Sequence, residues 1–342
     1  SLAGGPRPTG RPRTGALAAG SPRGHPPPTP SGPAAPSALP PSLELRVWPE
    51  PVLPERPYPL LLPYEHPALF AGREWELEKL RGLVSSPVPL FGLFALSGAG
   101  KSSILAGGLV PALRAEGVPV ALDRHPTETG LAARLLGDLF EPAGLEGLDP
   151  TELEQDPARF VALVREAGRL AGRPPVLVLD QFEDLFRSEA GPAARRTVGL
   201  LLAATVKREP GEAGPACRWV LACRRDFHGD VAAWLPDVLR EARVAGAVVV
   251  ENLPHDLSGP ERFHAWDLPA LGSPRPGASA TAAREAARQA FREAICKPLQ
   301  VTSPDGRPVF PWAIAPEDAD RLADAFADAR EKQPDTPLVP QL

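Results

Sequence analysis

One nine-residue segment constrains this chain more than any other. Residues 95–103 read Ala-Leu-Ser-Gly-Ala-Gly-Lys-Ser-Ser, between an apolar run at 88–95 and a helical pattern at 101–113 that we expect to stop near Pro111. Successive backbone N–H groups in such a loop, placed at a helix N-terminus, can cradle a chain of phosphates. The segment therefore predicts a strand, a phosphate-binding loop and a helix, in that order.

The residue types in this loop assign its chemistry. Gly98 and Gly100 allow close backbone approach, Lys101 reaches the β- and γ-phosphates, and the Ser102 hydroxyl ligates Mg²⁺. Ala95 stands where the usual pattern begins with glycine, so the first turn has to accommodate a Cβ. The expected nucleotide-binding residues are Gly98, Ala99, Gly100, Lys101, Ser102 and Ser103.

A second signal is the apolar strand at 176–179, which is followed by Asp-Gln-Phe-Glu-Asp. A carboxylate that emerges from the carboxyl edge of the sheet lies beside the phosphates, so we assign Asp180 to Mg²⁺ through water. Glu183 is the candidate to polarise the attacking water, with Asp184 in reserve. The alternative is that Glu183 and Asp184 only cap the following helix.

A third strand, at 218–223, ends in Arg224 and Arg225. An arginine at this edge can sense or neutralise the γ-phosphate, and we favour Arg224. The competing interpretation is a structural ion pair between Arg224 and a nearby carboxylate.

The order of segments predicts the fold class. Amphipathic helical patterns at 74–84 and from Pro157 alternate with apolar strand candidates at 88–95, 118–122, 176–179, 218–223 and 247–250. All-apolar strands are typical of a parallel sheet that is buried on both faces. We predict an α/β P-loop NTPase core at 57–252, with a mostly parallel five-stranded sheet flanked by helices. Helical patterns at 280–296 and 316–332 predict a small helical lid subdomain at 253–342.

Composition excludes several other classes. A net charge of -5 does not favour direct nucleic-acid binding, which needs a clustered positive field. No apolar run approaches the roughly 18 residues of a membrane span, so we expect a cytoplasmic protein. Cys217, Cys223 and Cys296 form neither a metal-binding spacing nor an even disulfide set.

The first 56 residues are rich in Pro, Gly and Ala and show no hydrophobic periodicity, which predicts a disordered linker. The chain begins at Ser1 and contains no Met. We interpret it as part of a longer reading frame, with an upstream effector domain before the linker, although a processed N-terminus remains the alternative.

Taken together, the motifs resemble those of the novel STAND NTPase family, signal-transduction ATPases related to the NACHT and NB-ARC proteins. The resemblance lies in residues 57–59, 70–74, 97–103, 179–186, 224–227, 291–298 and 336–339. The Asp-Gln-Phe-Glu-Asp run at 180–184 is its most discriminating part.

The resemblance implies a five-stranded parallel sheet in which the arginine-bearing strand lies beside the strand of the phosphate loop. It also implies that Gly72 and Arg73 lie near the adenine, and that Pro337 lines the base from the helical lid. The segment at 253–277 is longer than the family's usual connection, and the chain stops at Leu342, before the winged-helix portion and sensor repeats with which the family continues.

The expected function is an ATP-binding switch in which Mg-ATP, slow hydrolysis and nucleotide-dependent self-association control signalling. The guanine-reading Asn-Lys-x-Asp pattern is absent from the sequence, which favours ATP. The alternative is a nucleotide-binding oligomerisation scaffold without significant hydrolysis. A small-molecule kinase would need an acceptor pocket that the sequence does not display.

Overall fold

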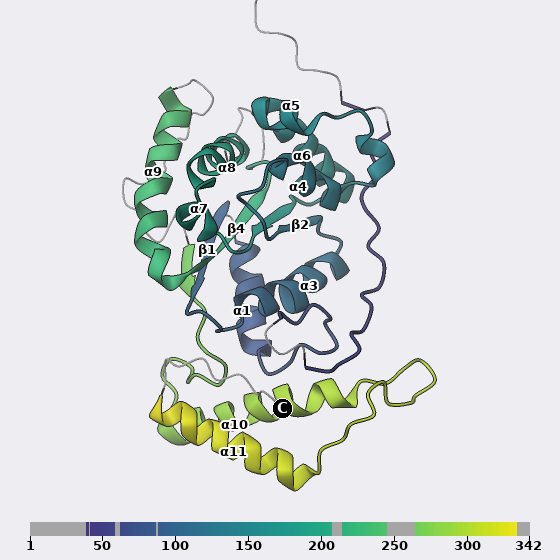
Figure 1. Cartoon of the computed structure of the whole chain (residues 1–342), viewed down its shortest axis with the longest axis vertical. Helices are drawn as coiled ribbons and strands as arrows, with labels where there is room; N and C mark the ends of the chain where they lie inside the picture. The colour runs from purple at the N-terminus through teal and green to yellow at the C-terminus, as the bar shows by residue number, and fades with distance from the viewer. Residues whose placement is uncertain are drawn as a thin grey trace, which may run out of the picture. The chain divides into compact units, whose positions relative to one another are not determined.

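A computed structural model describes residues 39–40, 42–58, 62–86, 88–206, 214–244 and 264–333 of the chain. Its centre is a five-stranded sheet with the order β2-β3-β4-β1-β5 (Figure 1). All the paired strands run parallel, which confirms the predicted fold class. The strands are β1 Leu90–Ala95, β2 Val120–Asp123, β3 Val176–Leu179, β4 Arg218–Arg224 and β5 His264–Asp267.

The strand register places the predicted site at one edge of this sheet. β4 lies beside β1, and Ala95 at the end of β1 pairs with Arg224 at the end of β4. The arginine-bearing strand is therefore next to the strand of the phosphate loop, as the family resemblance implies. The expected strand at 247–250 lies outside the described residues. β5 comes after residue 252, so the sheet takes one edge strand from the segment that the sequence assigns to the lid.

Helices connect the strands. The α-helices are α1 Glu74–Val84, α2 Lys101–Ser103, α3 Val110–Ala115, α4 Leu131–Leu139, α5 Pro150–Gln155, α6 Pro157–Ala171, α7 Asp184–Arg187, α8 Gly191–Val206, α9 His228–Val244, α10 Ala280–Cys296 and α11 Pro316–Lys332. The π-helical segment is η1 Ile104–Leu109, and the 3₁₀ turns are η2 Pro142–Leu145, η3 Arg225–Phe227 and η4 Lys297–Gln300. Within the described residues, no helix has the length and apolar content that crossing a bilayer requires.

The two faces of the sheet bury separate apolar clusters. Val176 and Val178 of β3 belong to the cluster under α1, η1 and α3, whereas Leu177 and Leu179 belong to the cluster under α4, α6 and α8. Alternate residues of a strand point to opposite faces, so a strand covered on both sides must be apolar throughout. Helices cover both faces of the sheet (Figure 1).

The helix after the phosphate loop differs from the prediction. It does not stop near Pro111 but continues to Ala115 through η1 and α3, so that prediction is wrong. Pro111 lies in the first turn of α3, directly after the π-helical segment. The hydrogen-bond register changes at that point, and a residue without an N–H donor is tolerated there.

Part of the predicted linker lies against the folded core. Leu45 forms an antiparallel bridge with Phe140, and the N–H of Arg46 donates to the Leu139 carbonyl at 2.9 Å. The guanidinium of Arg114 lies 3.3 Å from the ring centroid of Trp48. Residues 1–38 lie outside the described part of the chain.

The predicted lid helices have the expected bounds and pack side by side (Figure 1). Ala287 and Phe291 of α10 are buried against Ala323 and Ala327 of α11. Alanine contributes little apolar area, so this shared core is small.

Candidate nucleotide site

The phosphate loop leaves β1 and turns directly into α2. Gly98 has φ +75° and Gly100 has φ +89°, a left-handed conformation that favours glycine. Ala95 is fully buried as the last residue of β1. Its methyl group therefore packs in the core, and this explains how the loop accommodates the departure from glycine.

Lys101 and its neighbours begin the helix at the mouth of the loop. Lys101 is the first residue of α2 and is 9% exposed. Ser102 follows it and is half-buried, while Ser103 Oγ accepts a 3.1 Å hydrogen bond from the N–H of Tyr64. Ser103 therefore ties the loop helix to the segment upstream of α1.

Asp180 follows β3 at the same edge and is 1% exposed. Its Oδ1 accepts the N–H of Gln181 at 2.9 Å, whereas its buried Oδ2 has no hydrogen-bond partner among the described residues. A buried carboxylate oxygen without a partner is costly, so such a group commonly marks the place of an ion or ordered water. The residues present therefore fit a water-bridged Mg²⁺.

Glu183 is held between two strand ends. The carboxylate is 8% exposed, and its Oε2 accepts the N–H of Arg224 at 3.2 Å. Glu183 occupies the N-cap position of α7, yet its side chain makes no capping hydrogen bond. The Glu183 side chain therefore does not cap α7, as the alternative interpretation would require. Asp184 lies in the first turn of α7 and is half-buried.

The buried thiol of Cys223 interacts electrostatically with Glu183 and Lys101. Burial, with the charge of Glu183 as a second cause, raises the pKa of Cys223 to about 12, and the charge of Lys101 opposes this shift. The thiol is therefore protonated at neutral pH.

Arg224 forms a structural ion pair with a nearby carboxylate, which was the competing interpretation of its role. Its Nε and Nη2 donate to the two oxygens of Asp226 at 3.1 and 2.6 Å. This hydrogen bonding lowers the pKa of Asp226 and raises that of Arg224. Asp226 thus occupies two of the three guanidinium nitrogens of Arg224.

Gly72 and Arg73 lie where the sheet domain meets the lid helices. Arg73 donates to the carbonyls of Ala99, at 2.6 Å, and Pro269, at 2.8 Å. Gly72 has φ +76°, and a Cβ there would lie 2.3 Å from the Ala290 carbonyl of α10. Pro337, the third residue expected near the base, lies outside the described residues.

A cavity of about 290 Å³ adjoins the phosphate loop. Leu96 and Ala99 form its loop side, and residues 267–270 form its β5 side. Arg225 and Asp267, which both line it, make an ion pair of 3.1 Å. The Arg73 contacts thus join the two walls of this cavity.

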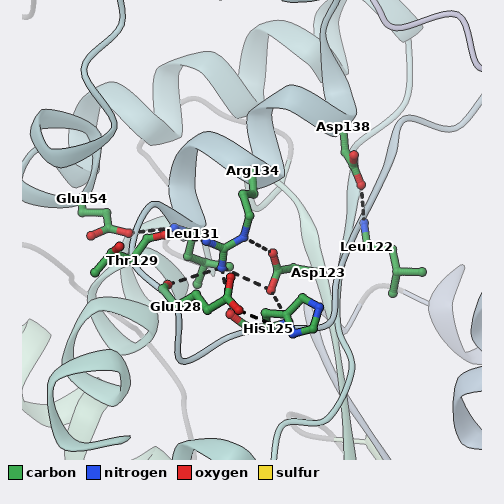
Figure 2. Close-up of polar contacts among 9 residues, drawn as sticks. All are labelled: Leu122, Asp123, His125, Glu128, Thr129, Leu131, Arg134, Asp138 and Glu154. Carbon is green, nitrogen blue, oxygen red and sulfur yellow. Dashed lines mark hydrogen bonds and ion pairs between the residues drawn. The ribbon is translucent and has the colours of Figure 1, made fainter. Parts of the chain in front are cut away.

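Asp123, the last residue of β2, is a further polar group at this edge that the sequence motifs did not indicate. Its carbonyl accepts the N–H of Asp180 at 2.8 Å. Its Oδ2 accepts from Nε of Arg134 at 2.6 Å (Figure 2). Arg134 also donates to the carbonyls of Thr129 and His125, which fixes the loop after β2 (Figure 2). The signal was present, since Asp123 ends an apolar strand in the same way as Asp180 follows one.

The parallel sheet and the loop together define the fold of a P-loop NTPase. The family model for Novel STAND NTPase 1 matches residues 57–258, more than half of the chain. The chain belongs to this family of NTPases. No curated protein matches the sequence significantly.

The chain is also similar to several solved structures, among them a Walker-type ATPase and two ORC proteins. A Walker-type ATPase of Pyrococcus abyssi has 13% identity and a TM-score of 0.38, covering 80% of this chain and 71% of that one. The Aeropyrum pernix ORC1 protein, solved in complex with DNA, has 17% identity, a TM-score of 0.36 and coverage of 80% and 64%. The Aeropyrum pernix ORC2 protein has 14% identity, a TM-score of 0.36 and coverage of 75% and 68%.

Proposed function

We propose that this chain is an ATP-binding switch of the STAND class. Mg-dependent ATP binding would hold the sheet domain and the α10–α11 hairpin in one arrangement, and slow hydrolysis or exchange would release it. The observation that carries this proposal is the unpartnered, buried Oδ2 of Asp180, at the same sheet edge as the Lys101 loop.

The phosphates would be bound by the loop from Gly98 to Ser103. Its backbone N–H groups and the Lys101 ammonium supply donors and positive charge. Ser102 and the water-bridged Asp180 would hold the metal, which supplies neutralisation of phosphate charge when bound. These assignments follow from residue type, burial and position at the sheet edge.

Hydrolysis would depend on Glu183 and Arg224. Glu183 would accept the proton of the attacking water, with Asp184 as the reserve. Arg224 would contact the γ-phosphate after exchanging Asp226 for it. The γ-phosphate and Asp226 would thus compete for the Arg224 guanidinium. The partner of Arg224 would then depend on whether a γ-phosphate is bound.

The nucleobase would lie on the β5 side of the loop. Arg73 supports this placement because its guanidinium joins Ala99 to Pro269, two residues that line the cavity of about 290 Å³. We propose that Gly72 and Arg73, with Pro337 from the lid, border the adenine. We further propose a cytoplasmic location and nucleotide-dependent self-association for the switch.

Calorimetry with Mg-ATP tests the phosphate assignment. Lys101→Ala should abolish measurable binding, while Lys332→Ala, at the exposed end of α11, should bind like the wild type. Equal affinities of the wild type and Lys101→Ala would show that the phosphates bind elsewhere.

The second candidate function is a scaffold that binds nucleotide without turning it over. One observation favours it, because the Arg224 guanidinium is already paired with Asp226. A steady-state phosphate-release assay separates the two functions. Turnover that is lost in Glu183→Gln supports the ATPase, and no turnover in either protein supports the scaffold.

A further inference from the structure

One buried arginine joins the phosphate loop to the connection between β5 and α10. Arg73 is 6% exposed, and its two terminal nitrogens donate to the carbonyls of Ala99 and Pro269. Burial lowers its pKa to about 10, and Glu76, at 3.6 Å, partly offsets this effect. A charge buried to this degree is maintained only by such partners.

A second buried arginine holds the same connection two residues further on. Arg330 of α11 is 3% exposed, and its Nε donates to the carbonyl of Leu271 at 3.0 Å. Its Nη1 donates to the carbonyl of Gln333 at 3.1 Å, at the end of α11. Arg73 and Arg330 therefore hold alternate carbonyls of one segment from two different elements, the N-cap of α1 and the last turns of α11.

The residues around Arg73 also contact the lid. Gly72 approaches the Ala290 carbonyl of α10 so closely that it leaves no space for a Cβ. The Lys297 ammonium, just after α10, donates to the Phe70 carbonyl at 3.0 Å. The short segment 70–74 is thus in contact with the phosphate loop, the β5–α10 connection and α10 itself.

The chemistry of the contact favours arginine over lysine. A guanidinium presents five donors in a rigid plane and can reach two carbonyls from different segments at once, whereas an ammonium is a compact point charge on a flexible stem. Replacing Arg73 by Lys keeps the charge but leaves one or both carbonyls without their donor. The link between the loop and the connection would be broken while the loop sequence stays intact.

We propose that Arg73 is a positioning residue that couples the phosphate loop to the α10–α11 hairpin through the connection held by Arg330. A ligand that moves the Ala99 carbonyl also moves the Arg73 guanidinium. Because Arg73 donates to the Pro269 carbonyl, this movement shifts the position of the connection and of the hairpin. Coupling of this kind is reciprocal, so the hairpin also affects ligand affinity at the loop. This inference rests on the proposed ATP binding.

The test measures hydrogen exchange of the full chain with and without saturating Mg-ATP. In the wild type, ATP should change the exchange of amides in α10 and α11. Arg73→Lys and Arg330→Lys should each lose this change. Arg284→Lys, in an exposed ion pair of α10, should keep it. By reciprocity, the ATP affinity of Arg73→Lys should fall by a factor on the order of 5–150.

The outcomes separate this coupling from ATP binding itself. If calorimetry shows that the wild type does not bind ATP, the proposed function fails first. If the wild type binds ATP but the hairpin amides do not respond, or respond equally in Arg330→Lys, the coupling is overturned and ATP binding stands. Arg330→Lys lies outside the phosphate loop, so it decides the question even if Arg73→Lys does not fold.

Discussion

The Oε2 atom of Glu183 accepts the backbone N–H of Arg224 at 3.2 Å. This bond joins the residues that follow β3 to the end of β4, the neighbouring strand. A carboxylate oxygen fixed by the main chain does not need to be reoriented when a reaction begins. This hydrogen bond therefore fixes the orientation of the Glu183 carboxylate more firmly than its own rotamer would. Such ordering suits the proposed role of a general base for water.

Glu183→Gln should retain ATP binding and lose turnover by about 10²–10⁴-fold, the usual contribution of a general base. Asp184→Asn should hydrolyse ATP at near the wild-type rate, because Glu183 and not Asp184 is the proposed general base. Phosphate release under steady-state conditions measures both. The reverse order of effects would make Asp184 the base.

Gly72→Ala should destabilise the protein strongly. A Cβ at this position would lie 2.3 Å from the Ala290 carbonyl, and φ +76° is strained for alanine. We expect a loss of at least about 1–3 kcal/mol in the free energy of unfolding, measured in urea. Gly82→Ala in α1 is the matched control, because a Cβ there meets nothing within 4 Å. It should stabilise the helix by roughly 0.5–1 kcal/mol. Equal losses in the two variants would contradict the close contact.

Gln181→Gly should stabilise the fold. Gln181 has φ +55°, the one non-glycine residue with positive φ in the described part of the chain. Relief of this strain should add about 1 kcal/mol to the free energy of unfolding. Glycine also raises the conformational entropy of the unfolded chain, which offsets part of this gain. Gln289→Gly, in the middle of α10, should instead cost about 1 kcal/mol. Urea unfolding that gives both variants the same sign would rule out strain at Gln181.

Stability of the α10–α11 hairpin should depend on salt. Its small alanine-rich core is accompanied by a row of ion pairs between the two helices: Arg284 with Asp328, Arg288 with Asp324 and Asp320, and Arg292 with Asp320. Partly exposed pairs contribute up to about 1 kcal/mol each and are screened by salt.

Arg288→Gln should give the largest loss in this row, about 0.5–1 kcal/mol at low ionic strength, because Arg288 contacts two carboxylates of α11. Arg321→Gln is the control, since Arg321 pairs only with Asp318 of its own helix among the described contacts. Hydrogen exchange of both helices at low salt and at about 1 M salt measures the effect. A difference between these variants that persists at high salt would point to packing as its cause.

Stability should also fall above pH 9. Burial raises the pKa of Cys217 and of Cys223 from 9.0 to about 12. The unfolded chain therefore loses these protons first, and the stability that is fully present below pH 9 is lost as the pH rises towards 12. Each thiol contributes a slope of up to about 1.4 kcal/mol per pH unit. The double variant Cys217→Ala, Cys223→Ala should show a shallower slope in urea unfolding between about pH 8 and 10.5. Identical slopes would show that other groups control the alkaline limit.

Local patterns predicted several elements with the bounds that the structure has. α1, α10 and α11 follow from apolar spacing and from capping or first-turn residues such as Pro316, all of which act within one helix. Asp156 caps α6, since its side chain accepts the N–H of Arg159 at 3.1 Å. Propensity alone misjudged Pro111, which follows a π-helical segment and lies in the first turn of α3.

The amino-acid pattern alone identifies the side chains that end the strands. Parallel strands bring their carboxyl ends to one edge, so the order of motifs was enough to place Lys101, Asp180 and Arg224 there. Only the tertiary structure decided what these groups and their neighbours bind. Arg224 pairs with Asp226, and Arg73 reaches Ala99 and Pro269. The physical reason is that a long charged side chain selects its partners among groups that folding brings within hydrogen-bond distance. For Arg73 these come from segments far apart in the chain, which no local pattern records.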